Sequence, residues 1–518
     1  MKGVWKLLIV FIVLTAALTT FAAAPAAPQQ STTVAPPAAT TTTSSGKSIE
    51  DSRDWFHHPT DWLTMGADER FRWEYGWNID DLKSDAKHRD TKWNFLRQRL
   101  RWWTKTKIND DMDFNMRLAW EFREWDTPNR KLGSGSSLEK RIHEQDLSEI
   151  IFDQLNLTVR NLGGAPLTMV FGRQDIFLGD GWLVCDAGPL DGSRSTYFDA
   201  LRFTYKIADQ QTLDAILIAN RAAEDAYIAP INNRHRLNTQ QDELGAILYY
   251  TDKTRPNLSF DAYFMFKGDN PVNHLNNLIG SAGYDGFPPW WTRKAQIYTF
   301  GGALYGAING SEHWKYRMEG AVQTGRQQGL VPLGTNNTYS VTHSMKNIMA
   351  FGTINKIEYN FNDEKKNKLR LMAEYMSGDD PGDGKIQQFN TLWGQWPRFS
   401  ELLAYAYNLE TRVGDITNLY RLGFGHSIQL TEKLSMDTDY NLLWADENTF
   451  KNQTHSSGFG FSGRGKFRGQ LVTWMLKYQI TKNLKAHILL EDYLPGNYYA
   501  SGSRDNAYYA RVNLEYTF

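Results

Sequence analysis

Positively charged side chains recur at every second position in a segment near the start of the chain. Arg97, Arg99 and Arg101 are followed at the same spacing by Lys105 and Lys107. A guanidinium group stays charged at any relevant pH and matches a carboxylate with two parallel hydrogen bonds. Since alternate residues of a β-strand point to one face, this spacing predicts a basic surface that attracts and binds anions.

The positions between the charged residues are largely apolar, which indicates strands with two different faces. In an earlier segment, for example, Phe71 and Trp73 flank Arg72. An Arg or Lys side chain costs about 2–4 kcal/mol at the midplane of a bilayer, so in a membrane strand the charged face must point away from lipid. Over the first three strands we count nine cations but only two carboxylates, Glu74 and Glu121, on this face, a net charge of +7.

The same pattern predicts further arginines on the inner face of other strands. The twelve inward arginines that it identifies are Arg70, Arg72, Arg97, Arg99, Arg101, Arg117, Arg123, Arg202, Arg317, Arg370, Arg421 and Arg511. Each could instead pair with an inward carboxylate and brace the wall. That alternative fits the Arg97–Arg101 run less well, because three like charges on one face repel unless an anion lies between them. A bulge near Trp102 and Trp103 would reverse part of the assignment.

These residues must be positioned by many strands with two kinds of connection. We place 18 strands between residues 66 and 518. Short connections with turn residues, such as Asn109-Asp110 and Asn309-Gly310, alternate with long ones, such as 125–149, 326–347 and 377–413. This alternation predicts an all-β fold, a transmembrane antiparallel β-barrel with short periplasmic turns and long extracellular loops. An even number of strands leaves both ends of the barrel in the periplasm.

The two ends of the chain agree with export to the outer membrane. Residues 1–24 have the basic start, apolar run and small-residue end of a secretory signal peptide. Residues 25–48, rich in Ala, Pro and Thr, cannot bury enough surface to fold and are expected to form a disordered leader. The barrel then occupies 49–518. Its last strand alternates apolar and polar residues up to Phe518 and resembles the terminal strand of bacterial outer-membrane barrels.

Composition narrows the functions that the chain can have. The formal net charge is −1, so the sequence as a whole does not predict a nucleic-acid partner. The chain contains 18 Trp, 25 Tyr and 27 Phe, but past the signal no apolar stretch is long enough for a spanning helix. A barrel accounts for both observations, because only alternate residues face lipid and aromatic residues gather at the two interfaces. The single Cys185 excludes an intramolecular disulfide.

Two motifs on neighbouring strands resemble the alginate export family. They are the Gly172-Arg173-Gln174 step with Gly179-Asp180, and the Phe198-Asp199 pair with Arg202. A second similar stretch runs from Glu374 through Phe389. The resemblance implies an 18-stranded outer-membrane barrel whose electropositive constriction passes a polyuronate. It also implies a structural or pore-lining role for Arg173 and a lumenal position for Arg202.

Other chemistry has little support in the sequence. No zinc-protease motif or nucleophile elbow occurs, so we expect no enzyme activity and no cofactor. The acidic stretch 379–384 has the composition of a calcium loop without its spacing, and a loosely bound Ca²⁺ is the one metal that we consider. The tryptophans in 288–291 and 392–396 either stack on a glycan at the outer mouth, or belong to the aromatic girdle or a folded-in loop.

The sequence therefore predicts a bacterial outer-membrane channel with an arginine-rich lumen. We expect its solute to be an anionic polysaccharide or oligosaccharide similar to alginate, passing by diffusion. The alternatives are a general or small-anion porin and, from another class, a hydrolase embedded in a barrel. Besides membrane lipid, export or uptake proteins of the periplasm are possible partners. The direction of transport, the oligomeric state and the loop that narrows the pore do not follow from the sequence.

Overall fold

A computed structural model describes most of the chain after residue 54. The described residues are 55–79, 82–84, 92–126, 145–146, 149–185, 197–223, 226–234, 239, 241–271, 293–333, 338–380, 384–394, 398–406, 416–448 and 460–518. All of them belong to one compact unit, Asp51–Phe518. The predicted signal peptide and leader lie outside the described residues, as do the tryptophans at 290, 291 and 396.

Nearly all regular structure in the described part of the chain is β-strand. The strands are β1 (Leu63–Trp77), β2 (Lys92–Asn109), β3 (Met112–Trp125), β4 (Gln145–Asp146), β5 (Ile150–Val159), β6 (Leu167–Gln174), β7 (Phe198–Ala208), β8 (Gln211–Asn220), β9 (Asp242–Asp252), β10 (Ser259–Asn270), β11 (Ala295–Ala307), β12 (Trp314–Leu333), β13 (Thr338–Asn360), β14 (Lys368–Met376), β15 (Leu419–Gln429), β16 (Leu434–Trp444), β17 (Phe467–Gln479), β18 (Leu484–Pro495) and β19 (Ala507–Thr517). No described helix is long and apolar enough to cross a membrane.

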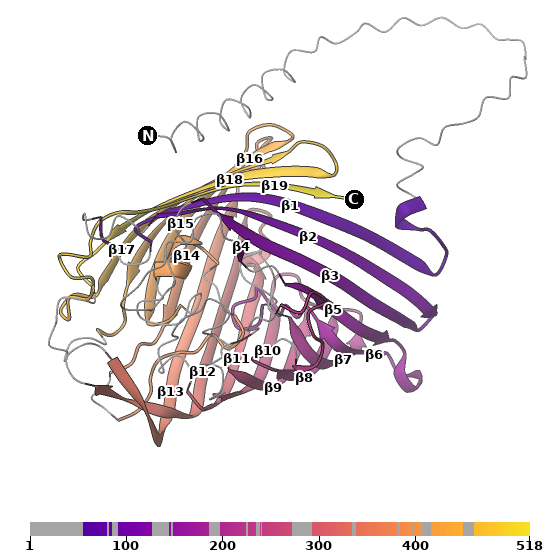
Figure 1. Cartoon of the computed structure of the whole chain (residues 1–518), viewed down its shortest axis with the longest axis horizontal. Helices are drawn as coiled ribbons and strands as arrows, with labels where there is room; N and C mark the ends of the chain where they lie inside the picture. Colours follow the sequence, from indigo (N-terminus) through magenta and orange to yellow (C-terminus); the bar gives the residue numbers. More distant parts are fainter. Residues whose placement is uncertain are drawn as a thin grey trace, which may run out of the picture. The chain divides into compact units, whose positions relative to one another are not determined.

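The strands form one closed antiparallel sheet. Each long strand pairs with the next along the chain, and β19 returns to pair with β1, for example through Arg70 opposite Glu515. The two strands lie side by side where the barrel closes (Figure 1). The two-residue β4 pairs only with the end of β3, so 18 strands make up the wall. The predicted strand number and antiparallel closure are confirmed.

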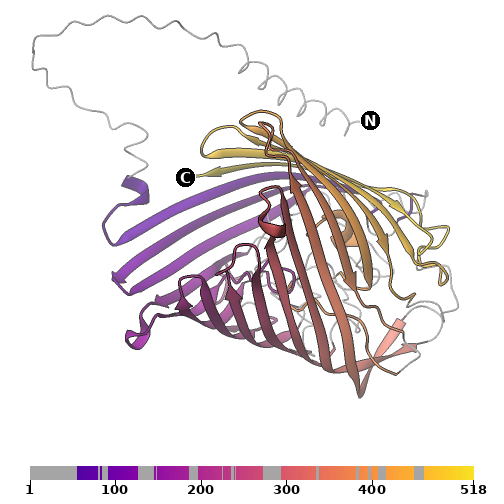
Figure 2. The ribbon, with the colours of Figure 1, turned by 180° about the vertical axis from the view of Figure 1, so that it is seen from behind.

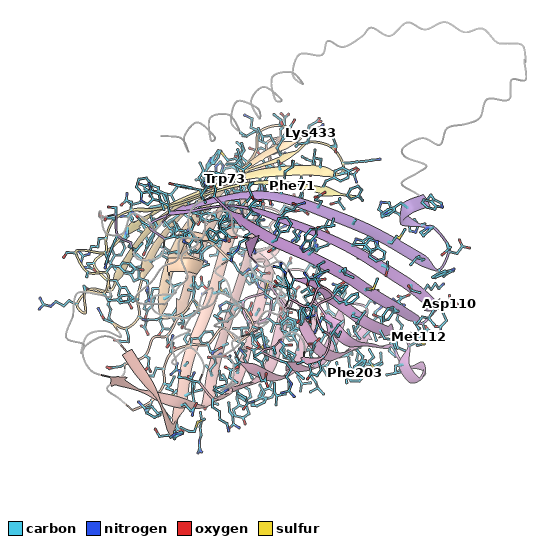
Figure 3. The ribbon with its side chains drawn as sticks, in the orientation of Figure 1. Phe71, Trp73, Asp110, Met112, Phe203 and Lys433 are labelled. Atoms are coloured by element: carbon cyan, nitrogen blue, oxygen red, sulfur yellow. The ribbon has the colours of Figure 1, made fainter. Side chains whose placement is uncertain are left out.

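Alternate residues face opposite sides of the wall, as the sequence predicted. Phe71 on β1 and Leu96 on β2 are 50 % and 58 % exposed, whereas their neighbours Arg70 and Arg97 are buried. Figure 3 shows the side chains around the barrel, with Phe71 and Trp73 on β1 and Asp110 at the short connection between β2 and β3. An apolar outer surface of this kind suits contact with lipid chains.

The prediction of a long loop over residues 326–347 is wrong. Residues up to Leu333 continue β12 and residues from Thr338 belong to β13, so the two strands extend past their neighbours as a ribbon (Figure 2). The partner strand β11 is already paired at its first residue, Ala295, with Gln327. Alternating Tyr339 and Val341 suit an extended strand, and cross-strand pairing with β12 satisfies the backbone without a third strand.

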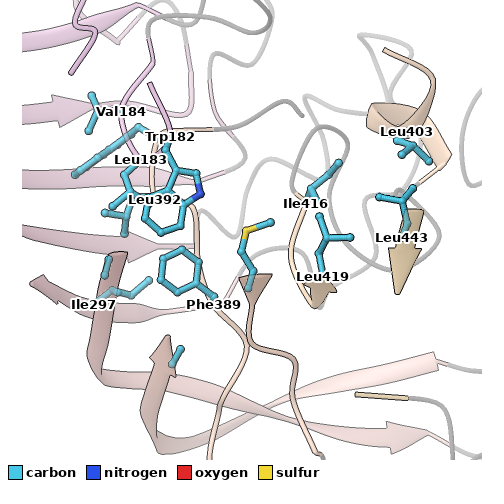
Figure 4. Packing of buried hydrophobic residues seen from close by; sticks show 14 of the residues in the cluster. Trp182, Leu183, Val184, Ile297, Phe389, Leu392, Leu403, Ile416, Leu419 and Leu443 are labelled. Atoms are coloured by element: carbon cyan, nitrogen blue, oxygen red, sulfur yellow. The ribbon is translucent and has the colours of Figure 1, made fainter. Parts of the chain in front are cut away.

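Two segments that follow β6 and β14 fold into the barrel and fill part of it. They are 175–185 and 384–394, which meet through a parallel bridge between Val184 and Trp393. Trp182 stacks on Phe389 with ring centroids 5.3 Å apart (Figure 4). Both rings belong to one buried cluster with inward residues of the wall, including Ile297 on β11. We call these two stretches the inward segments.

Candidate anion path

Five arginines of β1 and β2 share three carboxylates on the inner face of the barrel. Glu121 on β3 accepts hydrogen bonds from Arg70, at 2.9 Å, and from Arg97, at 2.7 Å. Arg99 and Arg101 both bind Asp68, at 3.2 and 2.9 Å. The third carboxylate, Glu74, lies 3.7 Å from Arg72 and 3.6 Å from Arg97. We call these eight side chains the arginine wall.

The strand register explains why these groups meet. Arg70 stands opposite Arg99, and Arg72 opposite Arg97, so four guanidinium groups crowd one patch of the inner face. The next pair toward the short-connection end joins Asp68 to Arg101. Like charges directly opposite each other destabilise a sheet, and the shared carboxylates offset that repulsion. No register shift interrupts the pairing of β1 with β2, so the bulge considered near Trp102 does not occur there.

The expected net charge of +7 on the first three strands is too high. Asp68 and Asp113 also face inward, where they bind Arg101 and Lys105 respectively. Nine cations therefore face four carboxylates, a net charge of +5. Asp68 was missed because it lies near the start of β1, where the alternating pattern is less marked. The excess of positive charge on this side of the lumen remains.

Exposure differs strongly along the wall. The side chains of Arg70, Arg72, Arg97 and Arg99 are at most 10 % exposed. Near the short connection exposure rises to 23 % for Arg101. Lys105 and Lys107, beyond it on β2, are 49 % and 51 % exposed. The deeper arginines thus brace the wall, and the outer cations face solvent.

The neighbouring strands continue the basic surface. Arg511 on β19 stands opposite Glu74 and binds Glu401, just before the short helix α4 (Leu402–Ala406), at 3.0 Å. Arg117 on β3 binds Asp153 and Asp175 at 2.7 and 3.0 Å. Arg123, also on β3, lies over the rings of Phe95 and Trp125, 5.4 and 5.1 Å from their centroids.

The two arginines taken from the family resemblance have different environments. Arg173 is 2 % exposed, binds Asp199 at 2.9 Å, donates to the Phe152 carbonyl and lies over the ring of Tyr197. It holds several elements together. Arg202 is 26 % exposed and binds only Asp214 among the described residues, at 2.7 Å. Its guanidinium edge faces the lumen.

The remaining predicted arginines lie on other parts of the wall, each beside carboxylates. Arg317 on β12 binds Glu319 at 2.8 Å. Arg370 on β14 binds Asp439 at 3.1 Å, and Arg421 on β15 binds Glu374 at 2.8 Å. The structure therefore does not bring the predicted arginines into one ring. They lie around the lumen, and the densest group is the arginine wall.

A buried lysine that the sequence did not single out anchors an inward segment. Lys267 on β10 is fully buried, donates to the Leu392 carbonyl at 2.9 Å and pairs with Glu243 at 3.0 Å. Trp393 donates to the same Glu243 through its indole N–H at 3.1 Å. Trp393 therefore packs its own inward segment against the wall and is not available to stack on a glycan at the outer mouth. The position of this lysine on the inward face of β10, between Met265 and Asp269, was the signal in the sequence.

A metal site finds no support in the described residues. They contain no group of three or more His, Cys, Asp or Glu side chains arranged to hold a metal ion. In the acidic stretch 379–384, Asp379 accepts a hydrogen bond from the backbone of Gln387, at 2.8 Å, and residues 381–383 lie outside the described part. Bound Ca²⁺ there stays a prediction.

The chain was compared with solved structures. OpdL of Pseudomonas aeruginosa is 11 % identical, with a TM-score of 0.50, over 88 % of this chain and 98 % of that one. OccAB2 of Acinetobacter baumannii is also 11 % identical, with a TM-score of 0.49 and the same coverage. At this identity the similarity to OpdL shows the fold alone. No curated protein matches the chain.

The family comparison is more specific. The model of the family described as "Alginate export" matches residues 61–513, which include every strand of the barrel except the end of β19. With the closed 18-stranded architecture, this match places the protein in the bacterial outer membrane as a channel. The chain belongs to the alginate export family.

Proposed function

We propose that this channel passes an anionic polysaccharide or oligosaccharide, similar to alginate, by diffusion along the basic side of its lumen. The observation that carries the proposal is the surplus of nine cations over four carboxylates on the inner face of β1, β2 and β3. A wall of one charge sign with low-dielectric surroundings raises the local concentration of the opposite ion. Membership of the alginate export family supports a polyuronate as the solute.

The distribution of exposed cations supports an entry at the periplasmic end. Lys105 and Lys107 lie next to the short connection at Asp110, on the side where Arg101 is partly exposed. A polyanion arriving there meets solvated cations first and the braced arginines beyond. Diffusion does not fix the direction of transport, so export and uptake are both compatible with this arrangement.

The apolar filling beside β7 to β13 supports a path next to the arginines of β1 and β2. The inward segments bury Trp182, Phe389 and Leu392 against the inner face of β7 to β13, and the same buried cluster also reaches Phe95 on β2 and Tyr509 on β19. A charged polymer does not bind such a surface, because its carboxylates would lose their hydration there without forming ion pairs or hydrogen bonds in exchange. The proposed path therefore runs along the charged strands.

Single-channel recording in planar bilayers tests the proposal. A salt gradient should give a reversal potential of anion selectivity, and micromolar polyuronate should interrupt the current from the periplasmic side. Cation selectivity of the wild-type channel would contradict the proposal. Anion selectivity without any interruption by the polymer would instead favour the alternative, a small-anion porin.

The exposed cations allow a sharper version of this experiment. Replacing Arg101, Lys105 and Lys107 by Gln removes three positive charges while the four deeper arginines of β1 and β2 stay in place. Selectivity for anions and sensitivity to the polymer should both fall. Lys253→Gln, in the exposed connection between β9 and β10, is the control and should leave both unchanged. Equal behaviour of the two variants would exclude the basic path.

We also infer that the channel carries out no catalysis. The family is one of transport channels, and inward carboxylates of the described strands are engaged by basic side chains or by hydrogen-bond donors, as Asp437 and Asp439 are by Arg370 and Glu491 is by the backbone N–H of Leu402. Such pairing gives these carboxylates a role without acid–base chemistry.

A further inference from the structure

A separate polar hollow lies in the inner wall, beside the arginine wall and close to the periplasmic end. Its volume is about 340 Å³, and side chains of β3, β5, β6 and β7 line it together with Asp175. The lining residues are Asn115, Gln154, Asn156, Val170, Gln174, Asp175, Arg202 and Thr204. Asn115 lies three residues from the start of β3 and Thr204 four from the end of β7, both near short connections.

Two small residues lie side by side in the wall next to the hollow. Asn156 stands opposite Gly172, and Gly172 opposite Ala200. Gly172 has a φ of +116°, and a Cβ there would lie 2.4 Å from the Leu155 carbonyl oxygen, so a side chain is excluded. The inner surface is therefore recessed between the amides on one side and Arg202 on the other.

Neighbouring groups fix the orientation of each amide. The amide nitrogen of Gln174 donates hydrogen bonds to three backbone carbonyls, those of Val170, Gly172 and Ala200, at 3.1–3.2 Å. A carbonyl oxygen only accepts hydrogen bonds, so the amide oxygen of Gln174 must point the other way. It has no hydrogen-bond partner among the described residues.

The same reasoning applies to two more amides. Asn156 donates a hydrogen bond from its amide nitrogen to the Arg173 carbonyl at 2.9 Å, so its amide oxygen is the acceptor that faces Asn115. Asn115 donates to that oxygen at 3.0 Å, and its own amide oxygen then has no hydrogen-bond donor among the described residues. Gln154 donates to the Asp175 carboxylate, which leaves its own oxygen without a partner in the described part of the chain. Three amide oxygens around the hollow are thus hydrogen-bond acceptors that no described donor satisfies.

Arg202 gives the hollow a positively charged hydrogen-bond donor, which suits the carboxylate of a solute. Its Nε donates to Asp214 at 2.7 Å, and Thr204 binds the same carboxylate, which holds the guanidinium in place. Neither terminal nitrogen of Arg202 has a partner among the described residues. Those two nitrogens form the edge that binds a carboxylate in bidentate geometry.

We propose that this hollow is a discrete binding subsite for one hexuronate unit of the transported chain. The sugar carboxylate binds the two terminal nitrogens of Arg202, and ring hydroxyls donate to the free oxygens of Asn115, Gln154 and Gln174. A neutral sugar has no carboxylate to bind Arg202, and a small anion such as acetate has no ring hydroxyls to donate to the amide oxygens. The inference rests on the proposed function and adds that the channel recognises its solute by a saturable site, apart from the general field of the arginine wall.

Interruption of the single-channel current by monosaccharides tests the subsite. Glucuronate should interrupt the wild-type current in a saturable manner, and glucose and acetate should not at the same concentrations. In Arg202→Gln half-maximal block should need about tenfold more glucuronate, equal to about 1.4 kcal/mol. Val170→Phe, which fills the hollow and leaves every charge in place, should have a similar effect. Arg255→Gln, in the exposed connection between β9 and β10, is the matched control, and glucuronate should block this variant as it blocks the wild type.

The outcomes separate the subsite from the proposed function. Absence of glucuronate block in the wild type, or equal block in wild type, Arg202→Gln and Val170→Phe, would refute the subsite even where anion selectivity persists. Equal block by acetate would also refute it, since that result needs only a positive charge. Cation selectivity of a wild-type channel that glucuronate still blocks with the expected variant pattern would refute the anion path and support the subsite.

Discussion

Replacing Glu121 by Gln tests whether shared carboxylates hold the arginine wall together. Glu121 is fully buried and binds two guanidinium groups, those of Arg70 and Arg97, whose side chains are 0 % and 10 % exposed. Removing one partner of a buried ion pair costs about 3–5 kcal/mol, because a charge stays buried without compensation. Arg97 keeps Glu74 at 3.6 Å and the new amide still accepts one hydrogen bond, so we expect the lower end, about 3 kcal/mol.

The measurement is urea-induced unfolding of the channel in detergent micelles, followed by tryptophan fluorescence. A loss of about 3 kcal/mol corresponds to a more than hundredfold change in the unfolding equilibrium constant. Glu124→Gln, three residues away on the exposed face of the same strand, is the matched control and should stay within about 0.5 kcal/mol of wild type. Arg70→Met in the Glu121→Gln background should restore part of the loss, since it removes a stranded charge.

The result that would refute this reasoning is a Glu121→Gln channel as stable as the Glu124→Gln control. The pairs would then add nothing to the stability of the wall. An additive loss in the double variant would equally show that Arg70 and Glu121 are not energetically coupled. Conductance supplies a second readout: Glu121→Gln removes a negative charge from the lumen and should raise anion selectivity, whereas Glu124→Gln and the double variant, which loses one charge of each sign, should stay near wild type.

Three further expectations concern the inward segments and a turn. Lys267→Met should release the segment that it anchors at Leu392 and raise single-channel conductance, whereas unchanged conductance would show that the anchor is dispensable. Gly394→Ala should separate the two inward segments, because its Cβ would lie 1.8 Å from the backbone oxygen of Trp182. We expect the free energy of unfolding in urea to fall by about 1–3 kcal/mol. A variant as stable as wild type would contradict that close approach. In the β13–β14 turn, hydrogen bonds from the side chain and backbone of Asn367 lower the pKa of Asp363. That stabilisation is present above the unfolded pKa of about 3.9 and is lost as pH falls through the lowered folded value. Asp363→Asn should therefore reduce the difference between urea midpoints at pH 7 and pH 2, and an unchanged difference would show that this carboxyl is not responsible.

The alternating pattern predicted the faces of the first three strands because two independent costs reinforce it. Charges avoid lipid, and apolar side chains avoid a wet lumen. Between β8 and β12 the pattern is weaker, since Ile218, Ile247 and Met265 point inward and are buried by the inward segments. A rule that assigns apolar residues to lipid fails wherever protein fills the lumen.

The inward segments left a signal in the sequence that the strand pattern did not use. Ile176, Leu178, Leu183 and Val184 lie in a connection expected to face water, where such residues have no reason to gather. They predict a buried loop, but they do not specify which wall it packs against. That choice depends on long-range pairing such as the bridge to Trp393, more than 200 residues further along the chain.

Charge pairing was the other feature that sequence reasoning could not decide. The inward position of Arg97 follows from alternation, but its partners depend on the register with β1 and β3. Glu74 and Glu121 were placed on the inner face correctly, and the pattern could not show that each would serve two arginines. Arg173 illustrates the same limit, because Gly172 has a left-handed backbone and disturbs the alternation just before it.

Bracing the wall and attracting anions are not alternatives for these arginines. In the arginine wall five guanidinium groups share three carboxylates, so every carboxylate is paired and a net charge of +2 remains. A wall in which each arginine had its own carboxylate would be equally rigid but would exert little net field. A wall without carboxylates would repel itself, at a cost that grows as the charges leave water. Sharing each carboxylate between arginines gives rigidity and a positive field together, and this explains why three like charges can follow one another on β2 before any anion enters the channel.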